Sequence, residues 1–264
     1  MGRNDVIRRA LSPVSIVLLL HVGALHAANV DASPGGDDEP ARAADIRFQV
    51  LNRGMRGYTA GKVAQAWCKT LQEAPTPDVV VLLVGTNDMI NSAHLTPLDT
   101  FRERYESLVD ELLGSSQHVV LVTLPPCVEE LLFRRHRHEL FAGMSPNERI
   151  RQANAIIREV ATRKRACLVD LDAVFAPGKY EEGNPHGLLV TVAASGRPDG
   201  VHPNAVGACR IGEAVAERIK SLGLAGGIIT CLGDSITYGG GLPGEGTAEG
   251  ETYPAVVMQL LNDL

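Results

Sequence analysis

The sequence has 264 residues, of which 45% are hydrophobic and 21% are charged, and its formal net charge is −6. That much apolar sequence can bury the core of one large domain or two small ones, which excludes a disordered chain. The acidic balance argues against nucleic acid as a partner, because sequence-independent binding to it needs a basic face. Five cysteines are also too few for a small protein built on disulfides.

The N-terminal segment 1–27 has the layout of a secretory signal peptide. Three arginines precede an apolar run over residues 14–22, and Ala27 offers a small residue at a cleavage point. The run is shorter than the roughly 20 residues that span a bilayer, so we expect no stable membrane anchor; an uncleaved anchor helix is the alternative. The protein is therefore expected to be exported, either to the periplasm or out of the cell.

Residues 28–44 are rich in Ala, Pro, Gly and Asp and have no apolar period. This composition predicts a flexible linker, which leaves residues 45–264 as one folded domain that holds all five cysteines. After export, these could form at most two disulfides, with one thiol unpaired. Cys167 and Cys231 lie in strand-like segments and are expected to be small buried hydrophobes.

Within the domain, short strand-like segments alternate with amphipathic helices. Five segments are mostly β-branched or Leu and are apolar on both faces, which is typical of buried parallel strands. These segments are Ile46–Leu51, Val79–Val84, Val119–Leu124, Cys167–Leu171 and Ile228–Cys231.

Between the strands, apolar stripes with a helical period predict helices around residues 63–71, 101–112 and 150–160. Two more helices are expected from about 204 to 222 and from about 253 to the C-terminus. The alternation predicts a doubly wound, three-layer α/β/α sandwich on a five-stranded parallel sheet. Its active site should lie at the carboxyl ends of the strands.

A candidate nucleophile follows the last predicted strand, which runs into Gly233-Asp234-Ser235-Ile236-Thr237. A serine at a strand-to-helix turn beside a glycine can present its hydroxyl above the sheet, as a nucleophile must. The alternative is an ordinary glycine turn with a capping serine. For Asp234, and for Asp88 after the second strand, turn and capping roles are expected.

Candidate oxyanion donors follow two other strands. The second strand runs into Gly85-Thr86-Asn87-Asp88, where the Asn87 amide can donate a hydrogen bond to a developing oxyanion or form an Asx turn. The first strand runs into residues 52–59, whose glycines let a backbone N–H approach a substrate oxygen closely.

A candidate base lies in Asp199-Gly200-Val201-His202-Pro203. The three-residue spacing on a turn can bring the Asp199 carboxylate to the His202 imidazole, which fixes its tautomer and stabilises the imidazolium.

Together these four segments resemble the SGNH hydrolases, the GDSL esterase and lipase family, over roughly residue 46 to the C-terminus. The resemblance implies a flavodoxin-like fold and a catalytic triad of Ser235, His202 and Asp199. It also implies an oxyanion hole formed by the backbone N–H groups of Ser235 and Gly57 and by the side chain of Asn87.

The order of the segments departs from the family. The family's serine block comes first, followed by the Gly, Asn and Asp/His blocks, whereas here the serine block comes last. The helix after Glu251 looks like the one that ordinarily follows the serine block. The chain therefore resembles a circular permutant, and this implies that strand 228–231 inserts centrally, between strands 46–51 and 79–84. We expect a monomer; a swapped dimer, in which the C-terminal segment completes a neighbouring site, is the alternative.

The expected function is that of an exported serine esterase. It would hydrolyse short-chain carboxylic esters through an acyl-enzyme, and acetyl esters of carbohydrates are among the expected substrates. The alternatives are a lysophospholipase or thioesterase that acts on longer acyl chains, and a non-catalytic binding module on the same fold.

Neither a metal nor a cofactor is expected. His136 and His138 lack a Cys or carboxylate at ligand spacing, and the glycine run 239–246 lacks the Lys-Ser/Thr of a phosphate-binding loop. The basic stretch 134–138 is expected to be a solvated helix face, with a loop that contacts an anionic substrate as the alternative.

Overall fold

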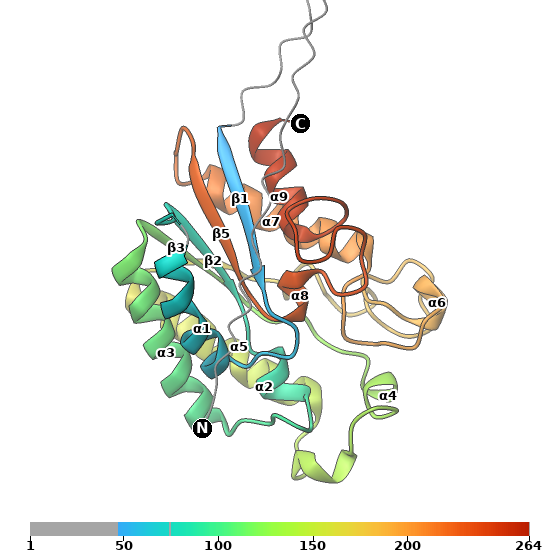
Figure 1. Ribbon diagram of the computed structural model, residues 1–264. Coiled ribbons are helices and arrows are strands. Elements are labelled where there is room, and N and C mark those ends of the chain that lie inside the picture. Colours follow the sequence, from blue (N-terminus) through green and yellow to red (C-terminus); the bar gives the residue numbers. More distant parts are fainter. Residues whose placement is uncertain (1–46, 74, 264) are drawn as a thin grey trace, which may run out of the picture. The chain divides into compact units, whose positions relative to one another are not determined.

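The structure is a computed structural model that describes residues 47–73 and 75–263 (Figure 1). The signal peptide and the linker, residues 1–27 and 28–44, lie outside the described residues and stay predictions. Within the described part of the chain, no helix combines the length and the apolar character that crossing a bilayer requires.

Five parallel strands form one sheet in the order β1-β5-β2-β3-β4. The strands are β1 (Phe48–Gly54), β2 (Val79–Leu83), β3 (His118–Val122), β4 (Cys167–Val169) and β5 (Gly227–Gly233). Every residue of β2 is buried, because helices cover both faces of a parallel sheet and a central strand then needs apolar side chains on both sides. The predicted five-stranded parallel sheet is confirmed.

The last strand of the chain is central. β5 pairs with β1 from Phe48 opposite Gly227 to Gly54 opposite Gly233, and its other edge pairs with β2. The predicted insertion of the C-terminal strand between the first and second strands is therefore confirmed. The circular permutation from which that place was predicted stays a prediction.

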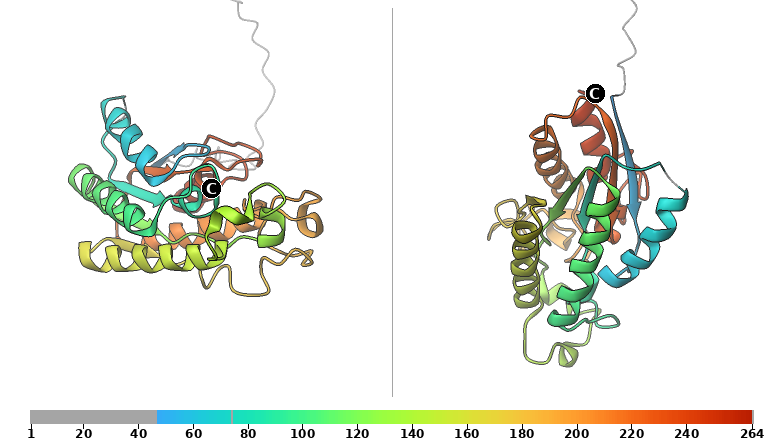
Figure 2. Two further views of the ribbon diagram at one scale, coloured as in Figure 1. Left: turned by 90° about the horizontal axis from the view of Figure 1, so that it is seen from below. Right: turned by 90° about the vertical axis from the view of Figure 1, so that its left-hand side faces the viewer.

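Helices cover both faces of the sheet (Figures 1 and 2). On one face lie α1 (Ala60–Glu73), α3 (Leu98–Ser115) and α5 (Pro146–Lys164), and on the other lie α7 (Ala205–Lys220) and α9 (Tyr253–Asn262). The apolar stripes that predicted these helices are buried against the sheet; on α3, for example, Phe101, Tyr105, Leu108 and Leu112 have no exposed surface. The three-layer sandwich is therefore confirmed.

Short helices follow several of the strands. They are α2 (Thr86–Ile90), α4 (Glu129–Leu132), the 3₁₀ helix η1 (His138–Phe141), α6 (Val192–Ser195) and α8 (Ser235–Tyr238). In Figure 1, α2 and α8 lie just beyond the carboxyl ends of β2 and β5, where the candidate catalytic residues were expected.

Several strand boundaries differ from the prediction. β1 continues to Gly54, beyond the predicted end at residue 51, because its ladder with β5 extends to that residue. β4 ends at Val169 rather than at residue 171, because β3 ends at Val122. Beyond that point the N–H of Leu171 donates to the Thr123 hydroxyl at 2.8 Å instead of to a backbone carbonyl.

The C-terminal helix is joined to the first strand by one side chain. The Asn262 carbonyl oxygen accepts the backbone N–H groups of Arg47 and Phe48 at 2.8 and 2.9 Å, and its amide donates to the Phe48 carbonyl at 2.9 Å. Asn262 is buried, so it satisfies backbone groups at the edge of the sheet that would otherwise have no partner.

We expect Asn262→Leu to destabilise the domain by about 2–4 kcal/mol, because several buried polar groups lose their partners while the side-chain volume is kept. Urea unfolding measures the change in the free energy of unfolding. The matched control is Gln259→Ala, an exposed position of the same helix, which should change it by less than about 0.5 kcal/mol. Equal stability of the two variants would contradict this role of Asn262.

Candidate active site

Ser235 is the first residue of α8, directly after the turn that ends β5. A Cβ at Gly233 would lie 2.1 Å from the Leu83 carbonyl oxygen, so only glycine lets β5 pass this close to β2. Asp234 then caps α8 by accepting the N–H of Ile236 at 3.0 Å. Together these contacts hold the Ser235 hydroxyl at the carboxyl edge of the sheet.

The Ser235 hydroxyl, the His202 imidazole and the Asp199 carboxylate form a hydrogen-bonded chain. Nε2 of His202 lies 2.9 Å from Oγ of Ser235, and Nδ1 lies 3.0 and 3.1 Å from the two carboxylate oxygens of Asp199. Asp199 also accepts the backbone N–H groups of Val201 and His202 at 2.9 and 2.8 Å, and these bonds fix the carboxylate beside Nδ1 of the ring. The structure thus brings together the three residues predicted as a triad.

The surroundings of Asp199 favour its charged form. Burial alone would raise the pKa of this carboxyl group, but the hydrogen bonds and charge of His202, with the charge of Arg135, outweigh burial and hold the pKa well below its usual range. Asp199 is therefore ionised at neutral pH. An ionised carboxylate at Nδ1 keeps Nε2 of the neutral imidazole free to accept a proton from Ser235.

Arg135, in the segment that follows α4, contacts the Asp199 carboxylate. Its guanidinium lies 3.2 Å from Oδ2 of Asp199, and it also donates to the Asp199 backbone carbonyl. Arg135 follows α4, which packs against the loop that carries the Asp–His pair: the N–H of Val128 donates to the Gly200 carbonyl at 2.8 Å. A Cβ at Gly200 would lie 2.7 Å from Cβ of Leu131, so the fit of the loop against α4 depends on glycine.

The predicted oxyanion donors lie in the same cleft as Ser235 and His202. This cleft, of about 230 Å³, is lined by Gly57 and Asn87 as well. The amide of Asn87 donates to the Tyr58 carbonyl at 3.0 Å, and its oxygen accepts the Asn91 amide at 3.1 Å. One N–H of the Asn87 amide is thus used to hold the loop of Gly57 in place, and the other remains for a ligand.

The backbone N–H groups of Gly57 and Ser235 have no acceptor among the described residues. Gly57 has a φ of 76°, a conformation in which a side chain would be strained. Two free backbone N–H groups and one amide side chain thus belong to residues that line the same cleft, and an oxyanion hole is formed from such donors.

Asp88 and Asp234 have the structural roles that were expected of them. Asp88 is buried on α2 and accepts the N–H of Ala60, the first residue of α1, and the Thr96 hydroxyl, both at 2.9 Å. Asp234 is fully buried, and burial raises its pKa to about 6. One of its oxygens has no hydrogen-bond partner among the described residues, and the other accepts the capping bond from Ile236. The cap thus holds the Asp234 carboxyl group in a buried position, where the negative charge is disfavoured.

The basic stretch 134–138 does not form the solvated helix face that was expected, since only part of it is helical and two of its residues line the cleft. Arg135 bonds to Asp199, and Nδ1 of His136 lies 3.0 Å from the Ser92 hydroxyl. Burial, with Arg135 beside it, lowers the pKa of His136. Sequence reasoning missed both contacts, because no local pattern links this stretch to Asp199 or Ser92.

The five cysteines are free thiols. Cys231 is buried in the core, as predicted, whereas Cys167 is only half-buried. Among residues 47–73 and 75–263, no group of three or more His, Cys, Asp or Glu side chains is placed to hold a metal ion.

A parallel α/β sheet that holds a hydroxyl, an imidazole and a carboxylate in line at its carboxyl edge has the layout of a serine hydrolase. The comparison with protein families agrees with this class. The model of the GDSL-like Lipase/Acylhydrolase family matches residues 28–208, a stretch that includes Gly57, Asn87, Asp199 and His202 and ends before Ser235. The chain belongs to this family, and with it to the carboxylic ester hydrolases.

Relatives and solved structures show what the chain is similar to. A multidomain esterase of Ruminococcus flavefaciens is 26% identical over 214 residues, which cover 73% of this chain and 24% of that protein. The chain thus spans about a quarter of the length of this relative.

An acetylxylan esterase and a lipase/acylhydrolase are among the solved structures that are similar to the chain. A catalytic mutant of an acetylxylan esterase from Geobacillus stearothermophilus has 20% identity and a TM-score of 0.46, covering 62% of this chain and 68% of that one. A lipase/acylhydrolase from Enterococcus faecalis has 23% identity and a TM-score of 0.46, covering 64% and 74% of the two chains.

We expect Arg135→Gln to lower kcat for a small neutral ester about three- to tenfold with little change in KM, because a partly exposed charge-assisted hydrogen bond is worth about 1 kcal/mol. Steady-state kinetics on p-nitrophenyl acetate separates the two constants. The matched control is Arg134→Gln, since Arg134 pairs with Glu182 instead of Asp199. An unchanged kcat in Arg135→Gln would show that Arg135 does not position Asp199.

Proposed function

We propose that this chain is an exported serine esterase that hydrolyses short-chain carboxylic esters, with acetyl esters of carbohydrates as its preferred substrates. The observation that carries the proposal is the in-line contact of Ser235, His202 and Asp199, at 2.9 and 3.0 Å. A non-catalytic binding module would need none of this alignment. Export rests on the sequence of residues 1–27 alone.

In the first half of the reaction, Nε2 of His202 takes the hydroxyl proton of Ser235 while Oγ bonds to the ester carbonyl carbon. Asp199, ionised throughout, stabilises the imidazolium that forms. The tetrahedral intermediate then collapses: the bond to the leaving alcohol breaks, and the imidazolium gives its proton to that alcohol. The acyl group remains on Ser235.

In the second half, His202 takes a proton from a water molecule, whose oxygen attacks the acyl carbon. Collapse of the second tetrahedral intermediate returns the proton to Ser235 and releases the carboxylic acid. In both halves the carbonyl oxygen becomes negative, and the N–H groups of Ser235, Gly57 and Asn87 stabilise it. Because these donors are already fixed by α8 and by the loop of Tyr58, they need little reorganisation as the charge develops.

The space beside Ser235 favours a short acyl group. Ser235 and His202 line a narrow recess, with the apolar side chains of Ile211, Leu242 and Tyr253 among its walls. Its free volume of about 10 Å³ is room for about one water molecule. A methyl group fits such a recess after a small adjustment, whereas a longer acyl chain would have to displace packed side chains.

The larger cleft, which Ser235 also lines, suits a polar alcohol. Arg56, Asn91 and His136 line it, and these side chains donate or accept hydrogen bonds. With its pKa lowered, His136 is neutral at neutral pH, so its imidazole can bond to a sugar hydroxyl. A lysophospholipase would instead need an apolar channel for its acyl chain, and the 10 Å³ recess argues against one.

We expect Ser235→Ala to abolish ester hydrolysis and Asn87→Ala to lower kcat about 10²- to 10³-fold, the effect typical of losing one oxyanion donor. Hydrolysis of p-nitrophenyl acetate measures both, and thermal unfolding reports whether the fold survives. The matched control is Ser195→Ala, an exposed serine on α6, which should keep full activity. Hydrolysis at the wild-type rate by Ser235→Ala would overturn the proposal and leave the binding module as the better hypothesis.

We expect kcat/KM to fall about tenfold or more from p-nitrophenyl acetate to the butyrate, because adding methylene groups to a filled recess costs about 1–3 kcal/mol. Leu242→Ala enlarges the recess and should reduce this preference. The control is Leu260→Ala, on the outer face of α9. Equal or faster hydrolysis of the palmitate by the wild type would instead favour an enzyme for long acyl chains.

A further inference from the structure

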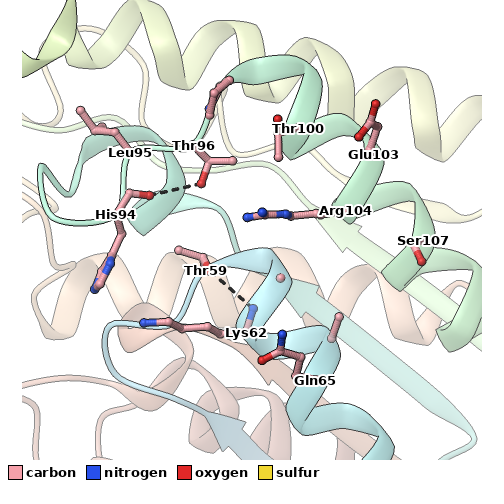
Figure 3. Close-up of a pocket in the computed structure, with 13 residues that line it drawn as sticks. Thr59, Lys62, Gln65, His94, Leu95, Thr96, Thr100, Glu103, Arg104 and Ser107 are labelled. Carbon is pink, nitrogen blue, oxygen red and sulfur yellow. Dashed lines mark hydrogen bonds between the residues drawn. The ribbon is translucent and has the colours of Figure 1, made fainter.

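A second pocket lies between α1 and α3 (Figure 3). Its volume is about 670 Å³, larger than the 230 Å³ of the catalytic cleft. Gly61 and Ala64 form part of its α1 wall, and their small size keeps it open. A Cβ added at Gly61 would lie 3.2 Å from Cδ of Arg104, so a larger side chain there would meet the arginine that crosses the pocket.

The pocket holds cationic side chains that form no ion pair within residues 47–73 and 75–263. Arg104 and Lys62 make no ion pair and no side-chain hydrogen bond among the described residues, and His94 lies at the same end of the pocket. Figure 3 shows the Arg104 guanidinium reaching between the walls, whereas Glu103, an acidic residue of the lining, is turned away from it. The charge of Arg104 acts on the buried Asp88 carboxylate, but no carboxylate in the described part of the chain is hydrogen-bonded to Arg104 or Lys62. An anionic group inside this pocket would therefore find the guanidinium of Arg104 and the ammonium of Lys62 free to donate hydrogen bonds.

Neutral hydrogen-bonding groups surround these cations. Gln65, Thr100 and Ser107 line the pocket, and their amide and hydroxyl groups can both donate and accept hydrogen bonds. A bare inorganic anion would leave most of them unused. A sugar that carries a carboxylate presents the charge for the cations and several hydroxyls for the rest of the wall.

The pocket adjoins the catalytic edge of the sheet. Thr59, in its wall, is two residues from Gly57, which lines the catalytic cleft. Asp88 joins the two sides of the pocket, because it accepts both the N–H of Ala60 at the start of α1 and the Thr96 hydroxyl. Since Asp88 follows Asn87 on α2, the walls of the pocket are attached to the helix that carries a proposed oxyanion donor.

We propose that the α1/α3 pocket is a subsite for an acidic sugar unit, a uronate, of the oligosaccharide whose ester is cleaved at Ser235. This inference rests on the proposed function for its choice of a carbohydrate substrate. Arg104 and Lys62 bind the carboxylate, and the polar side chains of the lining bind the sugar hydroxyls. The subsite thus selects acidic chains and leaves the ester chemistry unchanged.

Isothermal titration calorimetry with trigalacturonate, maltotriose and inorganic phosphate as separate probes tests this on the full chain. We expect trigalacturonate to bind more tightly than either other probe. Arg104→Gln should weaken its binding about tenfold, the change expected for the loss of one charge-assisted hydrogen bond. Gly61→Leu, which fills the pocket from the opposite wall, should weaken it as well. Both variants should hydrolyse p-nitrophenyl acetate as fast as the wild type.

The matched control is Arg102→Gln, on the same helix, whose guanidinium pairs with Glu159 outside the pocket; its affinity for trigalacturonate should be that of the wild type. Equal affinity of wild type and Arg104→Gln overturns the subsite. So does phosphate binding as tight as that of trigalacturonate, which would indicate a site for a free anion, or equal binding of maltotriose. These affinities are measured without ester hydrolysis, so they test the subsite alone. The esterase proposal is tested separately, by the hydrolysis rate of Ser235→Ala.

Discussion

The pairing of β5 with both β1 and β2 is the interaction on which the rest of the structure depends. It places Gly233 beside Gly54 on one side and Leu83 on the other. The turns that follow these three strands therefore lie next to one another, and they carry Ser235, Gly57 and Asn87. Since β5 is the last strand of the chain, the sheet is completed only by contacts of long sequence separation, which slow folding. The proposed catalytic residues thus come together only through contacts between distant parts of the chain.

The base and the acid are held by a different set of contacts. The loop of Asp199 and His202 lies some thirty residues after β4 along the chain, so the sheet cannot position it directly. The Val190 carbonyl accepts the N–H of Gly200, and the Val190 N–H donates to the His202 carbonyl. In addition, α4 packs against Gly200, and Arg135 bonds to Asp199. The segment between β3 and α5 therefore acts as a support for the Asp–His pair and also supplies His136 to the cleft.

Much of this arrangement could be predicted from the sequence, because its signals are local. Runs such as Val79–Leu83 predict buried strands, and Ser235, Asn87 and the Asp199–His202 pair stand in short motifs at strand ends or turns. Arg135 could not be assigned in this way. Its partner Asp199 is 64 residues away, and a basic stretch does not indicate which carboxylate it contacts. The α1/α3 pocket could not be predicted for the same reason. In the sequence, Arg104 and Lys62 look like ordinary solvated charges, and only the packing of the helices brings them to one pocket.

The two ends of the domain lie side by side, and this gives the unusual block order a physical rationale. Asn262, near the end of α9, bonds directly to the first residues of β1. A short connection from α9 to β1 would therefore join the two ends without moving either element. A break in the chain just before β5 would then place the serine block first, as in the family. The circular permutation itself stays a prediction. Such a permutation would leave the contacts of Ser235, His202 and Asp199 intact, because a triad depends on geometry and not on chain order.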